Sequence, residues 1–584
     1  MSKIVIETNE ILRERIKQAV VAAQSKGDLC EGALPEFTVE VPADRNNGDL
    51  ATNAAMASAR VFRMPPRAIA QKIIENIDLS GTYLERPQAA GPGFINFFFN
   101  DAFYAAVLRD VADKAEKYGR SDYGGGKRIN VEFVSANPTG PMHMGNARGG
   151  ALGDCLAAVL DMAGYDVERE FYINDAGNQI EKFALSLDVR YCSLYLPADD
   201  ERCVLPEDSY HGEDILQRAK EFSEVHGDKY INCSVEDRRN ALVAFALPRN
   251  IDGMKQMMSR YNIKYDTWFN ESALHGEDGE IKEVIDILTQ KGLTYEKDGA
   301  LWYKNAEVQT SLLKKQGKDE EYIKSLELKD DVLIRANGNT TYFAADIAYH
   351  RNKLKVRGFD KAIDIWGADH HGHVARLKGA LSAIGLCEDD LDIVLMQLVR
   401  LIKDGEPVRM SKRTGKAISL KDLLDDIPTD AVRFLFNMQS AGSQMDFDLD
   451  LAVEQSSKNP VYYVQYAYAR ICSIFRKAKE LGVEFSEVTP EQLERLNSAE
   501  ERELIHHIAA LTDEVIKSAE AYDPARITRY VVGLATLFHK FYNAHRVFAQ
   551  EQGLTEARLY LCECVRITIG NVLRAFKISA PERM

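Results

Sequence analysis

The sequence lacks the features that define several classes of protein. No apolar run approaches the roughly 18 residues of a membrane-spanning helix, and charged side chains interrupt the apolar residues of the first segment, unlike in a signal peptide. The nine cysteines include no pair with the two-residue gap of a zinc site. No internal repeat and no low-complexity tract is present. We therefore expect a globular, cytoplasmic protein without a membrane segment or structural zinc.

The net charge of −16 argues at first against a nucleic-acid partner, because such partners usually meet clustered Lys and Arg. The charge is unevenly spread, however. Residues 191–330 hold 19 basic and 28 acidic side chains, whereas residues 451–584 hold 17 of each. The acidic excess thus lies away from the C-terminal part, and the distribution of charge is a better guide than its sum.

Hydrophobic periodicity divides the 584 residues into parts. Residues 1–120 mix helical and strand-like runs, which predicts a small α+β domain. Residues 451–584 have helical periodicity alone, which predicts an all-α domain. The elements expected in the first domain are helices at 11–23, 49–60 and 66–77 and strands at 37–41 and 94–99.

The middle part, residues 126–450, has the pattern of a parallel α/β sheet. A strand at 129–135 is followed by a loop rich in Pro and Gly, a helix and a second strand at 167–173, which is the start of a βαβ unit. In such sheets ligands bind beyond the carboxyl ends of the strands. Strand patterns resume at 362–366 and 393–396, so the acidic segment of about 191–330 is predicted to be an insertion.

The loop after the first strand is suited to a phosphate. The helix that follows it offers unpaired N–H groups and the positive end of its dipole. Gly145 lets a nucleotide lie against the backbone, and His143 can donate to a phosphate oxygen. The alternative, a turn in which the histidine only caps the helix, is equally open at this point. The loop reads Ser135-Ala136-Asn137-Pro138-Thr139-Gly140-Pro141-Met142-His143-Met144-Gly145-Asn146.

A second cluster, at residues 409–416, is basic in an acidic chain. A flexible basic loop can stabilise a pyrophosphate leaving group. Taken alone, a solvated basic loop is the simpler interpretation. The cluster reads Arg409-Met410-Ser411-Lys412-Arg413-Thr414-Gly415-Lys416.

Together the two clusters resemble the HIGH-type and KMSK-type signatures of class I aminoacyl-tRNA synthetases, as His143-Met144-Gly145-Asn146 and Arg409-Met410-Ser411-Lys412. The finer resemblance is to the arginyl-tRNA synthetase family, and it covers essentially the whole chain. It rests further on Tyr172-Ile173-Asn174-Asp175-Ala176-Gly177-Asn178-Gln179, Gly367-Ala368-Asp369-His370-His371-Gly372, Asp430-Ala431-Val432-Arg433, Tyr462-Tyr463-Val464-Gln465-Tyr466-Ala467 and Pro581-Glu582-Arg583-Met584.

The resemblance implies a Rossmann-type catalytic domain with an insertion, an N-terminal tRNA-binding module and a helical anticodon-binding domain. The second histidine of the HIGH-type signature is Asn146 here, which can position a phosphate but cannot carry charge. Arg409 keeps the charge of the first lysine of the other signature, and Lys412 keeps the second. The implied catalytic residues are His143, Asn146 and Lys412, and the implied ATP-binding residues are Pro138, Thr139, Gly140, His143, Gly145, Asn146, Gly367, Asp369, His370, Met410, Ser411 and Lys412.

Arginine as the amino acid can also be argued physically. Carboxylates engage a planar guanidinium through parallel, charge-assisted hydrogen bonds. Matched to the family, Glu132 and Asp346 take this role, with Tyr342 one helical turn before Asp346. The other residues expected to bind arginine are Ser135, Asn137, His143 and His370.

Bases of single-stranded RNA loops stack on aromatic rings, and the helical domain interleaves tyrosines with polar residues. The residues expected to bind tRNA are Tyr462, Tyr466, Arg470 and Arg529; a solvated helix surface is the alternative for the last. ATP is expected as a substrate accompanied by Mg²⁺, and the histidine-rich run at 370–373 is read as a contact to adenosine or to an amino group. The family usually works as a monomer.

Two alternatives stay open from the sequence. One is a nucleotidylyltransferase of the same signature class that acts on a small molecule without RNA. The other is a catalytically weak RNA-binding relative, which only Asn146 suggests.

Overall fold

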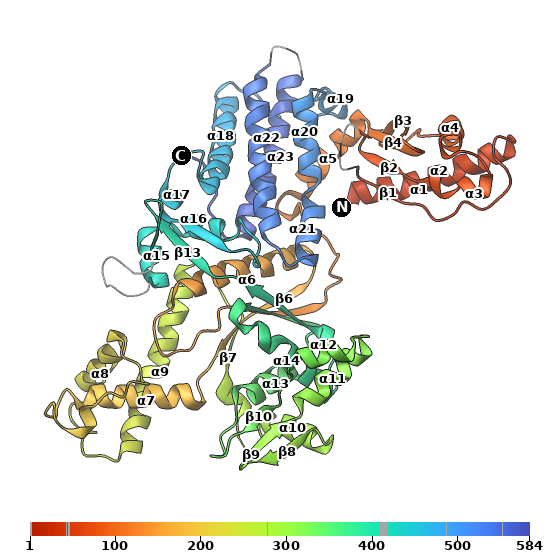
Figure 1. Ribbon diagram of the computed structural model, residues 1–584. Helices are drawn as coiled ribbons and strands as arrows, with labels where there is room; N and C mark the ends of the chain where they lie inside the picture. Colours follow the sequence, from red (N-terminus) through yellow and green to blue (C-terminus); the bar gives the residue numbers. More distant parts are fainter. Residues whose placement is uncertain are drawn as a thin grey trace.

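The computed structural model describes residues 3–42, 44, 47–276, 278–408, 418–485, 488–549, 551 and 553–584. A parallel sheet lies at the centre of the molecule. Figure 1 shows long helices standing above it, an N-terminal module projecting to one side, and two lobes below it that are built from residues inserted between its strands.

The central sheet has five parallel strands in the order β12-β11-β5-β6-β7. Helix α6 joins β5 to β6 and covers one face with apolar side chains, and α13 lies over the other face. The predicted βαβ unit and the Rossmann-type fold are confirmed. The elements are β5 (Arg128–Glu132), α6 (Met144–Met162), β6 (Asp166–Ile173), β7 (Thr267–Asn270), β11 (Lys361–Gly367), α14 (His371–Ile384) and β12 (Leu391–Met396).

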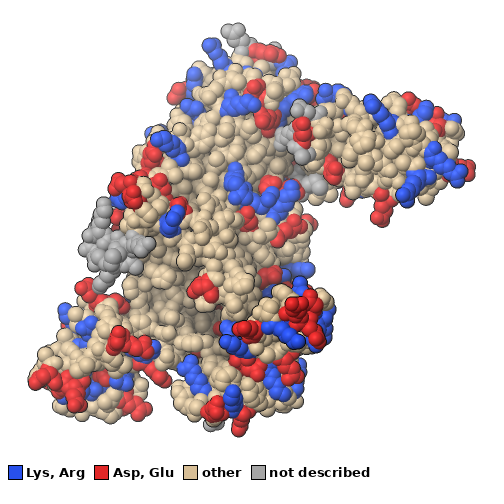
Figure 2. Space-filling view, viewed as in Figure 1, with Lys and Arg blue, Asp and Glu red and all other residues tan. Residues whose placement is uncertain are grey.

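The segment 191–330, expected as one insertion, returns to the sheet part-way. β7 lies within it and pairs with β6, so two separate lobes are inserted. The first lobe holds α7 (Gly177–Cys192), α8 (Glu213–His226) and α9 (Val235–Arg260). The second holds α10 (Glu280–Gln290), β8 (Thr294–Lys297), β9 (Ala300–Tyr303), α11 (Asn305–Lys315), α12 (Glu320–Ser325), β10 (Asp331–Ile334) and α13 (Tyr342–Arg351). In the view of Figure 2 acidic side chains gather at the outer end of the first lobe.

The N-terminal module is α+β, as predicted, with one difference. The helix expected at 49–60 begins as a strand, because Leu50 to Thr52 pair with β4 and are buried, and tertiary pairing overrides local propensity. The elements are α1 (Lys3–Ser25), β1 (Val39–Glu40), β2 (Leu50–Thr52), α2 (Ala54–Ala57), α3 (Ala59–Phe62), α4 (Pro66–Asn76), β3 (Leu84–Ala90), β4 (Phe94–Phe99) and α5 (Asp101–Lys114).

The C-terminal part is all-α, as predicted, and stands on α6 through a short connecting region. The connecting elements are β13 (Val399–Lys403), β14 (Glu406–Val408), α15 (Leu420–Asp426), α16 (Thr429–Phe436), β15 (Met445–Asp448) and α17 (Leu449–Val453). The helices are α18 (Pro460–Glu480), α19 (Pro490–Leu493), α20 (Ala499–Ala509), α21 (Leu511–Glu520), α22 (Ala525–Ala544) and α23 (Leu554–Ala575). Of all the helices in the described ranges, none is long and apolar enough to cross a membrane.

A buried carboxylate ties the helical domain to the catalytic sheet. Asp154, in the middle of α6 and fully buried, accepts hydrogen bonds from Arg433 Nη2 (2.5 Å), Lys577 Nζ (2.7 Å) and Arg169 Nε (3.2 Å). Burial alone would raise the pKa of Asp154, but these cations, Arg433 foremost, hold it below its usual value. Arg433 also donates to the carbonyl oxygens of Phe576 (3.0 Å) and Tyr261 (3.1 Å). One carboxylate therefore joins α6, β6, α16 and the segment after α23.

Asp154→Asn leaves the guanidinium of Arg433 buried without its anion. Breaking a buried pair in this way costs about 3–5 kcal/mol, so the thermal unfolding temperature should fall by several degrees. Asp446→Asn is the matched control, since the Asp446–Arg400 pair is exposed and such pairs contribute about 1 kcal/mol or less. Equal shifts in the two variants would contradict the role given to Asp154.

Candidate active site

The strand order indicates that the ligand crevice of this sheet is to be expected between β5 and β11. From β5 the chain crosses over α6 to β6 on one side, while β11 pairs with β5 on the other. Strand order thus reverses between β5 and β11, and open α/β sheets bind ligands outside the carboxyl ends of their strands at such a point. Glu132 and Gly367, both expected site residues, lie at the carboxyl ends of β5 and β11.

His143 is the N-cap of α6. Its Nδ1 accepts a hydrogen bond from the N–H of Gly145 (3.2 Å), and Asn146 Oδ1 accepts one from the N–H of His143 (2.9 Å). An accepting Nδ1 leaves the proton of the neutral imidazole on Nε2, and the side chain is exposed. The two interpretations of this histidine are therefore compatible: it caps the helix and keeps a donor for a phosphate. Asn146, which is buried, fixes the cap.

The start of the loop is strained. Val134 (φ 74°) and Ser135 (φ 41°) both lie in the left-handed region, which is rare for a β-branched residue. Ser135 Oγ donates to Glu132 Oε1 (2.8 Å) and accepts from the N–H of Tyr172 (3.1 Å). These bonds hold the backbone in a shape that costs energy, as is common at functional sites.

The middle of the loop packs against the first lobe. Pro138 and Thr139 are buried, and the carbonyl oxygen of Pro138 accepts from Asn250 Nδ2 of α9 (2.9 Å). Asn137 is exposed and Gly140 half-buried. These contacts make Pro138 and Thr139 supports of the loop, while Asn137 has an accessible side chain.

Of the second signature, Met410, Ser411 and Lys412 lie outside the described residues, as does Arg409. The chain that follows it reaches the first signature. Ser419 forms a β-bridge with His143, and the N–H of Leu420 donates to the carbonyl oxygen of Met142 (2.9 Å). The described chain thus returns at Ser419 to the first signature, more than 260 residues away in sequence.

At the carboxyl end of β11, Asp369 and His370 are open to solvent. Their side chains are 77% and 60% exposed, and Asp369 Oδ2 lies 3.7 Å from His370 Nε2. Both follow Gly367, the last residue of the strand. They are therefore accessible to a ligand in the crevice.

Three buried carboxylates stand side by side across the strands beneath this crevice. Asp364 of β11, Glu132 of β5 and Glu170 of β6 are in register, and their exposed fractions are 0%, 7% and 0%. We call these three residues the carboxylate row. Like charges on adjacent strands repel, so the row needs cations.

The cations come from the end of α13, from the π-helical turn Asn352–Val356 that follows it, and from Arg357 directly after the turn. Lys353 Nζ lies 2.5 Å from Glu132 Oε2 and 2.9 Å from Asp364 Oδ1, and His350 Nε2 lies 2.6 Å from Asp364 Oδ2. Arg357 donates to Glu170 Oε1 (3.0 Å).

These neighbours also set the charge states of the row. Burial would raise the pKa of Asp364, but Lys353 and His350 outweigh it and lower that pKa to about 2. Burial raises the pKa of Glu132 against the pull of Lys353. Glu132, which was expected to face a guanidinium, therefore already has a cation partner inside the protein, and the sequence did not predict this pairing.

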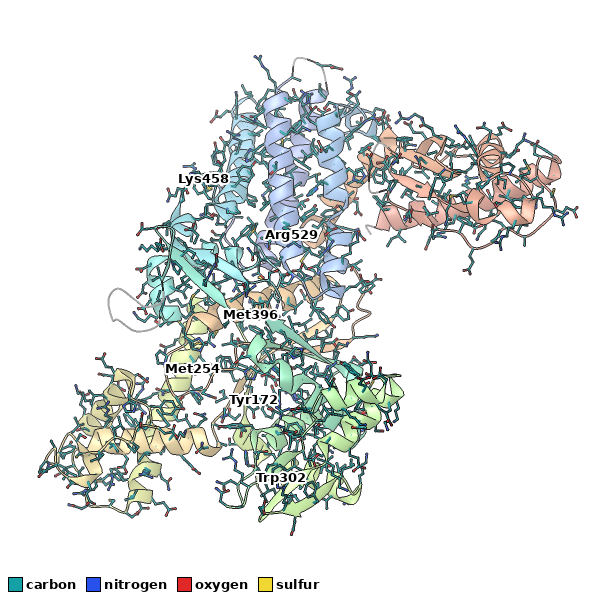
Figure 3. The ribbon with its side chains drawn as sticks, viewed as in Figure 1. Tyr172, Met254, Trp302, Met396, Lys458 and Arg529 are labelled. Carbon is teal, nitrogen blue, oxygen red and sulfur yellow. The ribbon has the colours of Figure 1, made fainter. Side chains whose placement is uncertain are left out.

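A second acidic group lies further along the crevice. Glu271 follows β7, is 4% exposed, and accepts a hydrogen bond from the hydroxyl of Tyr172 (2.9 Å). Among the described residues its one ion-pair contact is His275 Nε2, at 3.3 Å. Burial, and then the charges of Glu271 and Asp346, raise the pKa of Tyr172. In Figure 3 Tyr172 lies between the two lower lobes.

Asp346 and Tyr342 lie on α13, one turn apart as predicted. Asp346 Oδ2 lies 2.7 Å from His373 Nε2, and both side chains are partly exposed. Burial and the charge of Glu271 raise the pKa of Tyr342. Neither Glu271 nor Asp346 has a Lys or Arg partner in the described part of the chain. Because Glu271 is buried and a buried carboxylate is costly without a cation, this part of the crevice is suited to a cationic ligand.

The helical domain carries a basic groove of about 890 Å³. Within it, the guanidinium of Arg470 lies 4.9 Å from the ring of Tyr466 and 4.8 Å from that of Tyr542. Tyr462 and Tyr466 are parallel, with ring centroids 6.4 Å apart. The groove is lined by Tyr466, Ala469, Arg470, Ser473, Ile474, Arg476, Lys477, Tyr542, His545, Arg546, Val547, Phe548, Arg583 and Met584.

Arg529 does not belong to this groove. It lies thirteen residues before Tyr542 on α22, about 20 Å along the helix, and it pairs with Asp523 (3.2 Å). Figure 3 shows it at the end of the bundle that faces the sheet. The structure thus brings together Tyr462, Tyr466 and Arg470 but not Arg529.

Comparisons with known proteins show which family the chain belongs to. Residues 10–99 match the arginyl tRNA synthetase N terminal domain, residues 110–446 the catalytic domain of class I (R) tRNA synthetases, and residues 464–584 the DALR anticodon binding domain. The chain belongs to the arginyl-tRNA synthetase family. The resemblance argued from the two signatures is thereby confirmed.

Named relatives and solved structures of this family are similar to the chain over most of its length. The arginine–tRNA ligases of Caldanaerobacter subterraneus and Acetivibrio thermocellus are 50% and 48% identical to it over 584 residues, 100% of each chain. A structure described as a putative arginyl-tRNA synthetase from Campylobacter jejuni is 31% identical, with a TM-score of 0.70 over 83% of this chain and 100% of that one. The Thermus thermophilus arginyl-tRNA synthetase, 23% identical, shares the fold with a TM-score of 0.70 over 99% and 100% of the two chains.

Asn146→Leu removes the side chain that caps His143. Loss of a helix cap costs about 1 kcal/mol, so we expect a small fall in thermal stability with a larger loss of activity as His143 loses its orientation. Asn146→Asp keeps the acceptor and is the stability control. If the Leu variant melts like the Asp variant, the cap is not formed by this side chain.

Proposed function

We propose that this chain is an arginine–tRNA ligase. It activates L-arginine with ATP to give arginyl-adenylate and pyrophosphate, and transfers the arginyl group to the 3′-terminal adenosine of tRNA(Arg) for protein synthesis. The observation that carries the proposal is the pair Glu271 and Asp346, two carboxylates without a Lys or Arg partner among the described residues beside a nucleotide crevice, in a chain of this family.

ATP is proposed to lie over the carboxyl ends of β5 and β11. The N-terminus of α6 supplies N–H groups and a positive dipole end for its phosphates, Nε2 of His143 donates to a phosphate oxygen, and Asp369 and His370 meet the adenosine. Lys412, with Met410 and Ser411, is assigned to the leaving pyrophosphate by resemblance. Mg²⁺ is proposed to arrive on the phosphates of ATP, since it prefers such oxygens.

Arginine is proposed to place its guanidinium between Asp346 and Glu271, with Tyr342 against it. Planar, charge-assisted hydrogen bonds to two carboxylates favour arginine over lysine. Ser135, Asn137 and His143 are proposed to hold its α-amino and carboxyl groups. The binding role of Glu132 is then indirect, because Lys353 already balances its charge.

The first step joins a carboxylate oxygen of arginine to the α-phosphorus of ATP, and the bond from that phosphorus to the bridging oxygen of pyrophosphate breaks. In the second step a ribose hydroxyl of tRNA attacks the arginyl carbonyl carbon, loses its proton and releases AMP. No bond to the protein forms. Catalysis rests on positioning and on stabilising charge at the phosphates.

The tRNA is proposed to contact the basic groove of the helical domain, where Tyr462, Tyr466 and Arg470 offer stacking surfaces for loop bases. The family match of residues 10–99 supports a further contact by the N-terminal module. We propose a monomer that works in the cytoplasm; the nine free thiols fit a reducing compartment.

Pyrophosphate exchange, run with each amino acid with and without total tRNA, tests the activity. Exchange with arginine and with no other amino acid supports the proposal. The family's usual requirement for tRNA predicts that this exchange occurs only when tRNA is present. Exchange with another small molecule and no RNA would support a nucleotidylyltransferase instead. No pyrophosphate exchange with any amino acid, with or without tRNA, would support a catalytically weak RNA-binding protein.

Glu271→Gln and Asp346→Asn test the amino-acid pocket. Each keeps the shape of the side chain and removes its charge. A hydrogen bond to a charged group contributes about 1.5–3 kcal/mol, so the KM for arginine should rise roughly 10- to 100-fold while the KM for ATP changes little. Glu283→Gln, on an exposed part of α10, should change neither. An unchanged arginine KM removes that residue from the pocket.

Arg470→Met tests the RNA groove. It removes a cation that stacks on two tyrosines, and base or phosphate contacts of this kind contribute about 1–3 kcal/mol, so tRNA affinity should fall about tenfold or more in a filter-binding assay. Arg202→Met, in the first lobe and paired with Asp200, is the control. If the two variants bind tRNA with equal affinity, the RNA does not bind in this groove.

A further inference from the structure

Residues 349–357, from the end of α13 to the residue after the π-helical turn, contact all three members of the carboxylate row. Tyr349 donates its hydroxyl to Glu170 Oε1 (2.5 Å), and His350, Lys353 and Arg357 pair with the row as described above. Four donors from one short segment thus reach three neighbouring strands. The hydroxyl, imidazole, ammonium and guanidinium groups all face the sheet.

Lys353 is the central member of this set. It is 0% exposed, lies 4.3 Å from the centre of the Tyr349 ring, and bridges Glu132 and Asp364. A π-helical turn adds a residue to a helix, and such turns often occur at functional sites. Here the turn contains the buried lysine at its second position.

We propose that Lys353 is a positioning residue for arginine activation, which acts through Glu132. This inference rests on the proposed function. In this proposal Lys353 does not contact the substrate. Its contact with Glu132 Oε2 keeps that carboxylate charged and in place, so that Glu132 Oε1 accepts a hydrogen bond from the hydroxyl of Ser135. The strained start of the signature loop then keeps its shape.

The contacts form a continuous chain across the crevice. Lys353 holds Glu132 Oε2 (2.5 Å), Glu132 Oε1 accepts from Ser135 Oγ (2.8 Å), and Ser135 Oγ accepts from the N–H of Tyr172 (3.1 Å). The hydroxyl of Tyr172 then donates to Glu271 (2.9 Å). Ser135, in the middle of this chain, belongs to the loop that leads to His143, and Glu271, at its end, belongs to the proposed guanidinium pocket.

The same segment also connects α13, which carries Asp346, to strands β5 and β11 of the sheet. Asp346 lies on α13, and its carbonyl oxygen accepts from His350 Nδ1 (2.7 Å), while Nε2 of that histidine pairs with Asp364 in the sheet. Lys353 links this wall to β5 through Glu132. Loss of Lys353 therefore loosens the spacing between Asp346 and the signature loop, on which arginine binding depends.

The test compares full-length Lys353→Met with Lys353→Met/Glu132→Gln in tRNA-supported pyrophosphate exchange and in thermal melting. A displacement of about 1 Å at a binding group can cost a hundredfold, so Lys353→Met should raise the arginine KM about a hundredfold. The ATP KM should rise less than the arginine KM, because His143 is also held at the N-terminus of α6 by its own cap contacts. The double variant removes both charges, and the amide that Glu132→Gln introduces can donate to Asp364 while its oxygen still accepts from Ser135. It should melt near the wild type and keep an arginine KM about tenfold above it.

Lys361→Met is the matched control, because Lys361 lies at the amino end of β11, away from the crevice, and pairs with Asp392 (2.6 Å). It should leave the arginine KM unchanged. If Lys353→Met does not fold, the double variant decides: a wild-type arginine KM in it overturns the inference.

Three further results would overturn the inference. They are a wild-type arginine KM in folded Lys353→Met, equal rises in the KM values for arginine and ATP, and a double variant as impaired as the single one. A wild-type enzyme that shows no exchange with arginine would instead overturn the proposed function, and the inference would fall with it.

Discussion

The repulsion among three buried carboxylates is the constraint around which the catalytic domain is arranged. Asp364, Glu132 and Glu170 lie abreast on adjacent parallel strands, where a sheet of this kind normally presents apolar side chains. Their charges can remain only because one segment brings an imidazole, an ammonium and a guanidinium to them. The second lobe therefore also supports the sheet, since the segment that ends it, from α13 to Arg357, supplies the cations that balance the carboxylate row.

The opposite face of the sheet follows a different rule. There α6 packs with apolar side chains, and one carboxylate, Asp154, gathers cations from β6, α16 and the segment after α23. The N-terminus of the same helix carries His143. The helical domain and the proposed phosphate site thus share one helix, α6, so RNA at the site proposed in the groove would be connected to the crevice through α6 without any direct contact between the two.

Much of the fold follows from local patterns in the sequence, because periodicity reports which face of an element is buried. The strand at 94–99, the βαβ unit and the all-α C-terminal part are examples. β7 was not predicted because a four-residue strand inside a long polar insertion has no distinctive pattern, and Glu271 was missed with it. Lys353 looks like a surface lysine in the sequence; only the π-helical turn and two distant acids explain why it is buried. The signature loops could be found because their chemistry needs unusual residues close together, whereas the supporting charges are scattered over more than 200 residues.

The π-helical turn also makes the length of its segment a constraint. Each residue removed from a helix rotates everything beyond it by about 100° relative to what precedes it. A deletion within 342–357 that restored a regular helix would turn Arg357 away from Glu170 even if every side chain of the row were kept. Substitutions in this stretch change one contact at a time, but a change of one residue in its length would uncouple the whole set, so among homologous chains the spacing from Asp346 to Arg357 should vary less than the residues between them.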